Sequence, residues 1–466
     1  MPAPAAQYQR AIHWFRRDLR IRDNPALHQA CTSSKELVPL YLLSEWQKTH
    51  PWTGPKRQQF LCESLEDLSR SLSRLGGRLI LRKGPQLEEI EKLLSETRAD
   101  ALFLNKDPDP FGKAVETQLK KLCQDRGVAF HSFDDVSLHP FDAILKQDGT
   151  PYRVFTPFSK PWLAESVQDL SPAPTHLSTP AELSSLPLPD LSCWGLGPQS
   201  TGALPGGEAQ ARDRLAAALT HRIDSYDTNR DSPGIAGTSR LSQDLRWGTI
   251  SVRELYRSAR TKSSENYPKE LGWRDFYFSI LHHFPDVLEQ EFNPDWRGLP
   301  WKTPDGKFDA WREGQTGFPI VDAGIRELLS TGFMHNRVRM IVAMFLTKDL
   351  HLDWRLGEQF FAQHLVDGEI ASNNGGWQWS AGTGADAAPY FRIQNPWAQS
   401  KRHDPEGRYI RRWVPELAGA TAKSIYTPPA PGQSVHPGYP KPILDHSTER
   451  DVTLALFKDH KARNKG

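Results

Sequence analysis

The sequence has few of the features that mark membrane, secreted or metal-bound proteins. It contains only four cysteines, which lie far apart without a CxxC pair, so neither a zinc cage nor a redox pair is predicted, and we expect no metal. The longest apolar run, Met340 to Leu346, is far shorter than the roughly 20 residues of a membrane helix. The first ten residues lack the pattern of a secretory signal, so we expect a cytoplasmic protein without a membrane partner.

An excess of charge of one sign is also missing. The 466 residues carry a net charge of +2 and are 38% apolar, which is ordinary for a globular protein. This composition excludes a disordered or collagen-like chain. It argues against a histone-like nucleic-acid binder, although a local basic patch remains compatible with it. The length suggests two or three domains.

Between Ala11 and about Phe133, short apolar runs alternate with amphipathic stretches. The runs AIHWF, VPLYLL, RLILR, ALFLN and VAFHSF have the character of strands, and the segments between them have the i, i+3, i+4 spacing of helices. This alternation predicts an α/β domain over residues 9–135 with a five-stranded, parallel, doubly wound sheet. WFRRDLRIRDN stands in and after the first strand, where a dinucleotide fingerprint would require GxGxxG.

The second half of the chain has a different character. Residues 171–207 are rich in proline, serine and glycine, so we expect an interdomain linker over 136–207. Helical apolar spacing then dominates, which predicts an all-α domain over 208–466 with a C-terminal tail. Ten of the 15 tryptophans lie between Trp247 and Trp413. We therefore expect the chemistry there, although most tryptophans are simply core residues.

The segment GTSRLS (237–242) combines a glycine, three hydroxyl side chains and an arginine. Backbone N–H groups, small donors and a cation are what a pyrophosphate requires. Ser242 is also the expected N-cap of a short helix, and serine or threonine at such a place is far more often a cap than a phosphate ligand.

The segment ELGWRDFY places Glu270, Trp273, Arg274 and Tyr277 on one face of a helix. A carboxylate, a guanidinium and two aromatic rings on one stripe are typical of a ligand site. The alternative is an amphipathic helix with an ion pair between Glu270 and Arg274.

In MHNRVRM, the residues Asn336, Arg339 and Met340 share a face of a strongly apolar helix. A buried asparagine and arginine need hydrogen-bond partners, and a polar ligand in a cavity would supply them.

The densest polar cluster is DGEIASNNGGWQW (367–379), with two carboxylates, two asparagines, a glycine pair and two tryptophans. It is compatible with a generic turn, or with a ring of hydrogen-bond partners around a flat ligand that the glycines allow to approach.

Together these motifs, with TGFMHNRVRM, DWRLGEQFF and AAPYFRIQNP, resemble the photolyase and cryptochrome family over nearly the full chain, and most of all its class I cyclobutane pyrimidine dimer photolyases. The resemblance implies an α/β antenna domain, a long linker and an all-helical domain that binds FAD. It implies a DNA-repair enzyme that acts as a deoxyribodipyrimidine photo-lyase, and we expect a monomer that binds DNA containing pyrimidine dimers.

The resemblance also implies roles for individual residues. Those implied to bind the FAD phosphates and ribityl region are Tyr226, Thr238, Ser239, Arg240, Leu241 and Ser242. Those implied to surround the isoalloxazine and adjoining groups are Tyr267, Arg274, Arg339, Asp367, Glu369 and Asn373, of which Asn373 would face flavin N5.

Further residues are implied to contact the lesion and the DNA. The implied lesion pocket and DNA contacts are Arg230, Glu270, Trp273, Tyr277, Asn336, Arg337, Met340, Trp379 and Gln399. Target bases that leave the stack are held in this way by stacking and polar contacts, and photolyases are a named example of that principle. The basic run 401–412 would add phosphate contacts, or is merely a solvated face.

Trp377, Trp354 and Trp301 match a three-tryptophan relay that carries an electron to the excited flavin. The implied reaction is light-driven electron transfer from reduced FAD to a flipped-out cyclobutane dimer, with Glu270 bonding the dimer radical. The alternatives are a cryptochrome, a (6-4) photolyase, and a light-independent flavin or electron-transfer protein. Asn336 and Met340 stand where the (6-4) branch typically has histidines, which favours cyclobutane dimers.

The antenna is the least defined feature of the resemblance. Phe111 and Gly112 stand where folate-binding members have Asn and Glu, so a methenyltetrahydrofolate antenna is not supported. NKDPDPFG instead resembles deazaflavin- or flavin-binding members, with Asp107 and Asp109 as candidate ligands. Tyr267 replaces a tryptophan found in some members, and Glu369 replaces a frequent aspartate.

Overall fold

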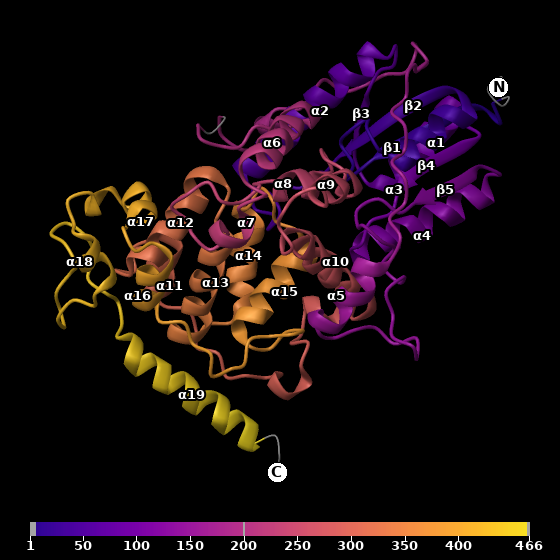
Figure 1. The fold of residues 1–466 in the computed structure, drawn as a ribbon. Coiled ribbons are helices and arrows are strands. Elements are labelled where there is room, and N and C mark those ends of the chain that lie inside the picture. The colour runs from indigo at the N-terminus through magenta and orange to yellow at the C-terminus, as the bar shows by residue number, and fades with distance from the viewer. Residues whose placement is uncertain (1–5, 199–200, 464–466) are drawn as a thin grey trace.

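The computed structural model describes residues 6–198 and 201–463. Figure 1 shows an α/β part formed by the first third of the chain and a helical part formed by the second half. The strands are β1 (Tyr8–Phe15), β2 (Ser34–Leu43), β3 (Ile80–Lys83), β4 (Ala101–Asn105) and β5 (Ala129–Phe133). They form one parallel sheet in the order β3-β2-β1-β4-β5.

The sheet is covered on both faces. The helices of this part are α1 (Pro25–Ser33), α2 (Pro55–Arg74), α3 (Gln86–Thr97) and α4 (Pro110–Asp125). Along β1, Ala11 and Phe15 belong to the core shared with α1 and α2, whereas Ile12 and Trp14 belong to the core shared with α3 and α4. Successive side chains of a strand point to opposite faces, so this division confirms the predicted doubly wound sheet.

The segment after β5 crosses to the helical part. It contains α5 (Phe155–Ala164) and the 3-10 turn η1 (Leu191–Trp194). Its extended portion runs along the α/β part, where Leu37 donates to the Ser178 carbonyl and Leu186 to the Leu81 carbonyl. β5 ends at Phe133 and α6 begins at Glu208, and the boundaries 9–135, 136–207 and 208–466 stay a prediction.

The helical part contains many elements and no strand among its described residues. Its helices are α6 (Glu208–His221), α7 (Tyr226–Asn229), α8 (Ser242–Trp247), α9 (Val252–Ala259), α10 (Tyr267–His283), α11 (Gly306–Glu313), α12 (Pro319–Thr331), α13 (Asn336–Met344), α14 (Trp354–His364), α15 (Ile370–Ala381), α16 (Pro396–His403), α17 (Arg408–Trp413), α18 (Ala422–Tyr426) and α19 (His446–Arg463). Shorter turns are η2 (Pro285–Leu288), η3 (Pro294–Trp296), the π-helical turn η4 (Phe345–Asp349) and η5 (Pro415–Leu417).

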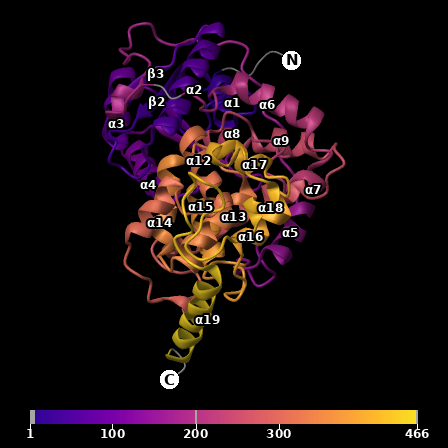
Figure 2. The same ribbon diagram turned by 90° about the vertical axis from the view of Figure 1, so that its left-hand side faces the viewer.

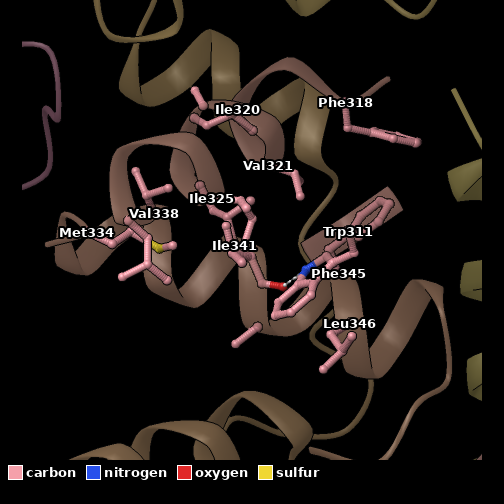
Figure 3. Packing of buried hydrophobic residues seen from close by; sticks show 14 of the residues in the cluster. Trp311, Phe318, Ile320, Val321, Ile325, Met334, Val338, Ile341, Phe345 and Leu346 are labelled. Carbon is pink, nitrogen blue, oxygen red and sulfur yellow. Dashed lines mark hydrogen bonds between the residues drawn. The ribbon is translucent and has the colours of Figure 1, made fainter. Parts of the chain in front are cut away.

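One hydrophobic core cluster of the helical part includes residues of α11, α12 and α13. Figure 3 shows Trp311, Phe318, Val321, Ile341 and Phe345 packed together, all almost fully buried. The indole N–H of Trp311 donates to the Val342 carbonyl, so this large ring is fixed in both position and orientation. The core therefore holds α13 rigidly.

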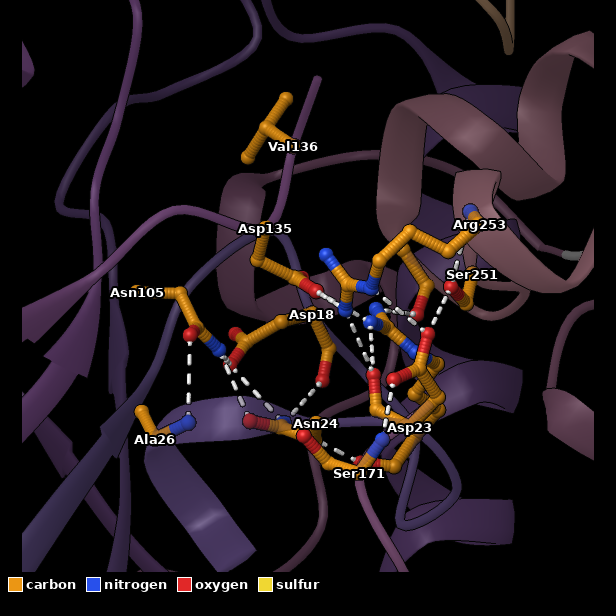
Figure 4. Close-up of polar contacts among 12 residues, drawn as sticks. Asp18, Asp23, Asn24, Ala26, Asn105, Asp135, Val136, Ser171, Ser251 and Arg253 are labelled. Carbon is orange, nitrogen blue, oxygen red and sulfur yellow. Dashed lines mark hydrogen bonds and ion pairs between the residues drawn. The ribbon is translucent and has the colours of Figure 1, made fainter. Parts of the chain in front are cut away.

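A buried ionic network joins the two parts (Figure 4). Arg253, at the start of α9, donates to the carboxylates of Asp23 and Asp135, which belong to the α/β part. Arg20 also donates to Asp135, and all four side chains are almost fully buried. Removing one member would leave a buried charge without its partner, so the network fixes how the two parts meet.

Three local predictions were wrong. Ser242 is the first residue of α8 and not its N-cap, which is Leu241. Most of the polar cluster 367–379 is not a turn, because α15 begins at Ile370. Asn336 is the first residue of α13 and is exposed, so the argument from a buried asparagine fails.

Candidate functional site

A cavity of about 540 Å³ opens into the helical part. Its walls come mainly from α8, α10, α13 and α15, and from the segment 238–241. Figure 1 shows these helices grouped at the centre of the molecule. The volume lies within the roughly 300–1,000 Å³ that is usual for cofactor sites.

Most of the predicted site residues line this cavity. They are Tyr226, Arg230, Thr238, Ser239, Arg240, Leu241, Ser242, Tyr267, Glu270, Trp273, Arg274, Tyr277, Asn336, Arg337, Arg339, Met340, Asp367, Glu369, Asn373, Trp377 and Trp379. Trp301, Trp354, Gln399, Asp107 and Asp109 do not line it. The structure thus brings together side chains from motifs that are far apart in the sequence.

The segment 238–242 forms one end of the cavity. Arg240 has a positive φ of 55°, and its guanidinium lies over the Phe333 ring and 3.3 Å from Glu327. Tyr267 is hydrogen-bonded to Ser239, and burial raises the pKa of Tyr267 to about 12. The Tyr226 ring packs edge-on against Tyr267. These contacts hold a short polar segment against the cavity without a side-chain cap on α8.

An ion pair lines the cavity between α13 and α15. Arg339 donates to Asp367 Oδ2 over 2.8 Å and to the Met334 carbonyl over 2.7 Å. The other carboxylate oxygen of Asp367 is buried and has no hydrogen-bond partner among the described residues. Because a buried, unpaired carboxylate oxygen is costly, this atom fits an N–H donor from a ligand in the cavity.

The α/β part reaches the same region. Arg17 forms an ion pair with Glu369, which also lies 3.9 Å from Arg246. Burial and the neighbouring guanidinium groups of Arg17 and Arg57 lower the pKa of Arg246 well below its ordinary value. The predicted site residue Glu369 is therefore held by the N-terminal part, a contact that the sequence did not reveal.

Asn373 has a fixed orientation on α15. Its amide nitrogen donates to the Glu358 carbonyl over 2.9 Å, and Asn374 donates to the Glu358 carboxylate. Burial raises the pKa of Glu358 to about 7. The two glycines that follow have different surroundings: a Cβ on Gly375 would lie 2.1 Å from the Tyr277 ring, whereas a Cβ on Gly376 would meet no protein atom within 4 Å. Only Gly376 leaves room on the cavity side.

At the mouth of the cavity two arginines pair with carboxylates. Arg230 lies 2.6 Å from Glu270, and Arg337 donates twice to Asp231. Burial raises the pKa of Glu270, an effect that Arg230 opposes. The alternative predicted for α10 is wrong, because Glu270 pairs with Arg230, while Arg274 donates to the Val136 and Leu245 carbonyls.

Aromatic rings form the apolar side of the mouth. Trp273 stacks on Phe155 of α5, with ring centroids 3.9 Å apart, and Tyr277 packs beside it. Trp273 and Trp379 are both half-buried and line the cavity, so each keeps part of its surface free for a ligand. Flat apolar rings beside the Glu270 carboxylate suit a ligand that is planar and has polar edges.

The three tryptophans of the predicted relay belong to, or pack against, one hydrophobic core cluster. Trp377 lines the cavity, Trp354 is fully buried, and Trp301 is half-buried at the edge of the same core. The Trp377 ring packs directly on α14 at Gly357, where an added Cβ would lie 2.0 Å from the ring. Trp354 begins that helix, and its indole N–H donates to Glu291.

The remaining predicted residues lie elsewhere. Gln399 is half-buried on α16, outside the cavity. Asp109 is the N-cap of α4, where it accepts from the Gly112 N–H. Burial alone would raise the pKa of Asp107. The Arg17 guanidinium, 3.1 Å from that carboxylate, outweighs burial and lowers the pKa to about 2. Both aspartates therefore already have partners within the chain.

Several cavity residues were missed by sequence reasoning. Arg246, Phe333 and Ser372 line the cavity but carry no motif signal of their own. Arg246 follows Ser242, the last residue of GTSRLS, by one turn of α8. This spacing places it on the same side of the helix and could have indicated its role. Among the described residues there is no group of three or more His, Cys, Asp or Glu arranged for a metal, and none of the helices could span a membrane.

The donors and acceptors of the cavity fit FAD. The unpaired oxygen of Asp367 suits the imide N–H of an isoalloxazine ring, and Gly376 leaves space for a flat ring against α15. The hydroxyl groups and Arg240 of the opposite end suit a pyrophosphate.

Comparisons with known proteins agree with this reading of the cavity. The family model described as DNA photolyase matches residues 11–178, and the model described as the FAD binding domain of DNA photolyase matches residues 267–459. A deoxyribodipyrimidine photo-lyase of Synechococcus is 38% identical, with 97% of both chains covered. The chain belongs to the DNA photolyase family. The predicted family, fold and FAD-binding domain are thereby confirmed.

Solved structures of photolyase-family proteins have the same fold. A bacterial class III photolyase from Agrobacterium tumefaciens is 36% identical, covers 99% of both chains and has a TM-score of 0.90. An archaeal photolyase from Sulfolobus tokodaii, solved with two FAD molecules, is 33% identical over 97% of this chain and all of its own, with a TM-score of 0.86. A Synechocystis cryptochrome is 28% identical over 96% of this chain and 99% of its own, with a TM-score of 0.86. The class I assignment stays a prediction.

Proposed function

We propose that this member of the photolyase family repairs cyclobutane pyrimidine dimers in DNA in a reaction driven by light. The observation that carries the proposal is one cavity with two chemically different ends. Its inner wall holds the Arg339–Asp367 pair and Asn373, which suit a flavin, and its mouth holds Glu270, Trp273 and Trp379. A flavin and a flipped-out pyrimidine dimer would thus share one cavity.

The inner residues bind and orient the cofactor. Asp367 accepts a hydrogen bond through its unpaired oxygen, while Arg339 fixes the position of that carboxylate. Glu358 fixes the Asn373 side chain, which faces the flavin ring. Reduced FAD, when bound, supplies on excitation by blue or near-UV light the electron that opens the cyclobutane ring.

The mouth residues hold the dimer. Trp273 and Trp379 stack against its pyrimidine rings and exclude water, while Glu270 and Asn336 bond the polar edges. Met340, at the next turn of α13 after Asn336, adds a polarizable apolar contact. Burial raises the pKa of Glu270, and the ion pair with Arg230 opposes that shift and holds the carboxyl group in place.

DNA binding uses the two arginines of the mouth. In the free protein Arg230 and Arg337 are paired with Glu270 and Asp231. Phosphates compete for these guanidinium groups, and Tyr277, Gln399 and the basic run 401–412 extend the contact surface. A release of condensed counterions then makes DNA affinity fall as salt rises.

The tryptophans supply electrons to the cofactor. The buried order Trp377, Trp354, Trp301 leads from the cavity wall to the edge of the core, and indole is the most readily oxidised of the ordinary apolar side chains. We infer that this relay returns an oxidised cofactor to its active, reduced form.

The second chromophore is a flavin or deazaflavin in our proposal. The Sulfolobus tokodaii photolyase, whose second FAD is described as implying a novel light-harvesting cofactor, supports this class over a folate. The engagement of Asp107 and Asp109 within the chain weakens their assignment as its ligands. We further propose a cytoplasmic monomer.

One assay tests the function and its alternatives. The FAD-loaded, reduced protein is incubated with an oligonucleotide that carries one thymine cyclobutane dimer, in blue light and in the dark, beside a (6-4) substrate. Loss of the cyclobutane dimer only in the light supports the proposal. Repair of the (6-4) substrate alone would identify a (6-4) photolyase, and failure with both lesions would favour a cryptochrome.

A further inference from the structure

The C-terminal helix α19 is attached to the body by a narrow stripe of side chains. Its buried residues are His446, Thr453, Phe457 and His460, whose spacing places them on one face, and Phe457 is the only large apolar side chain among them. Figures 1 and 2 show the end of the helix projecting from the molecule. Segments with few buried apolar contacts open locally more easily than the core.

Side chains of α19 contact an unusual backbone segment. The Thr453 hydroxyl donates to the carbonyl of Lys348, within the π-helical turn η4, and His446 Nδ1 lies 2.6 Å from the carboxylate of Asp349. Glu449 lies 2.6 Å from His351 Nε2, and His351 has a positive φ of 56°. Such π-turns and left-handed non-glycine residues persist where the surroundings hold them, and they are frequent at functional positions.

The same helix contributes to a small apolar cluster at the outer end of the predicted relay. Phe457 packs with Trp296 and Leu299 in a small cluster, and Trp301 packs against this cluster. The indole nitrogen of Trp301 is buried and has no hydrogen-bond partner among the described residues. Glu449 of α19 also lies 3.9 Å from Lys302, the next residue. With α19 in place, the Trp301 N–H therefore faces neither water nor a proton acceptor.

We propose that α19 is a gate on the tryptophan relay. The proposal rests on the relay of the proposed function and concerns how its outer member loses a proton. When Trp301 has given an electron to Trp354, its indole is a radical cation, which is a far stronger acid than indole. With α19 docked, the proton has no acceptor, so the electron returns to Trp301 and net reduction is slow.

Displacement of α19 changes the fate of that radical cation. Water then reaches the indole nitrogen and accepts its proton, which leaves a neutral indole radical that no longer recovers its electron quickly. An external thiol supplies one electron and one proton to this radical and restores Trp301. The relay has then delivered one electron to the cofactor, and one thiol has been oxidised to a thiyl radical that couples with a second one to a disulfide.

The test uses the full-length protein loaded with oxidised FAD. Phe457→Asp places a charge at the buried contact, and Val452→Asp is the matched control at an exposed position of the same helix. The double variant T453E/F457D also removes the bond to the Lys348 carbonyl. Trypsin cleavage near Lys458 and Lys461 reports which variant has displaced α19. The readouts are the photoreduction rate with a thiol, the lifetime of the tryptophan radical, and light-driven repair after chemical reduction.

We expect photoreduction of the displaced variant to be about fivefold faster, equivalent to about 1 kcal/mol between the barriers of proton loss and electron return. Val452→Asp should match the wild type, and repair by the chemically reduced proteins should be equal. Unchanged photoreduction and radical lifetime in a variant with α19 displaced would overturn the gate. If Trp301→Phe leaves photoreduction unchanged, the relay itself is wrong, which is a distinct failure.

Discussion

Gly376 provides a sharp test of where the cofactor lies. It is inside α15, it lines the cavity, and a Cβ added to it would meet no atom within 4 Å from the described residues outside its own stretch of helix. Gly376→Ala should therefore stabilise the protein without cofactor, by about 0.8–1 kcal/mol, because alanine is the better helix former in a helix interior.

The same methyl group should weaken FAD binding. If the flavin ring packs on α15 as proposed, the methyl group occupies its space, and overpacking of this kind costs about 1–3 kcal/mol. The dissociation constant of FAD should then rise by about 5- to 150-fold. Urea unfolding of the protein without FAD gives the first quantity, and titration of the protein with FAD, followed by flavin fluorescence, gives the second.

Two glycines serve as controls for Gly376. Gly306→Ala on α11 adds a methyl group in open space away from the cavity and should leave FAD affinity unchanged. Gly357→Ala would bring a methyl group to 2.0 Å from the Trp377 ring, so it should destabilise the fold. If Gly376→Ala stabilises the protein and binds FAD as tightly as the wild type, then α15 is not the wall on which the flavin packs.

Three further changes test the other parts of the site. Glu270→Ala should lower the repair yield per absorbed photon while FAD stays bound, because the dimer loses its carboxyl partner, and release of FAD instead would contradict that role. Arg337→Ala should weaken DNA binding and reduce the slope of log affinity against log salt by about one unit; an unchanged slope would show that Arg337 contacts no phosphate. Burial raises the pKa of Glu358 to about 7, so the folded state binds its proton more tightly than the unfolded state. As the pH rises from about 4.5 to 7, the free energy of unfolding of the wild type should fall by at most about 3 kcal/mol. Urea titrations at each pH should show no such fall for Glu358→Gln.

Local patterns were sufficient to predict the sheet and most helices. Each buried parallel strand is a short apolar run, and each helix between strands repeats its apolar residues with a period near 3.6, so both signals are contained in short windows of sequence. The sequence pattern did not predict where α13 begins. His335 accepts from the Arg337 N–H as its N-cap, and nothing in the apolar pattern around Asn336 marked that boundary.

Motif reading also placed most of the cavity residues, because each motif keeps its side chains on one face of a helix. Glu270, Trp273 and Tyr277 lie at i, i+3 and i+7 on α10, and all three line the cavity. Ion pairs between residues of different motifs could not be predicted in this way. Glu270 pairs with Arg230 instead of Arg274, because the approach of α7 to α10 decides which guanidinium is nearest.

The sequence by itself determined the α/β and helical halves and the chemical character of the site, because both depend on residue types at short, regular spacings. Only the tertiary structure decided that Arg17 of the N-terminal part holds Glu369, that Gly375 makes room for Tyr277, and that Trp301 packs against the cluster to which Phe457 of α19 belongs. These contacts join segments far apart in the chain. They depend on packing distances and buried charges, which no local pattern encodes.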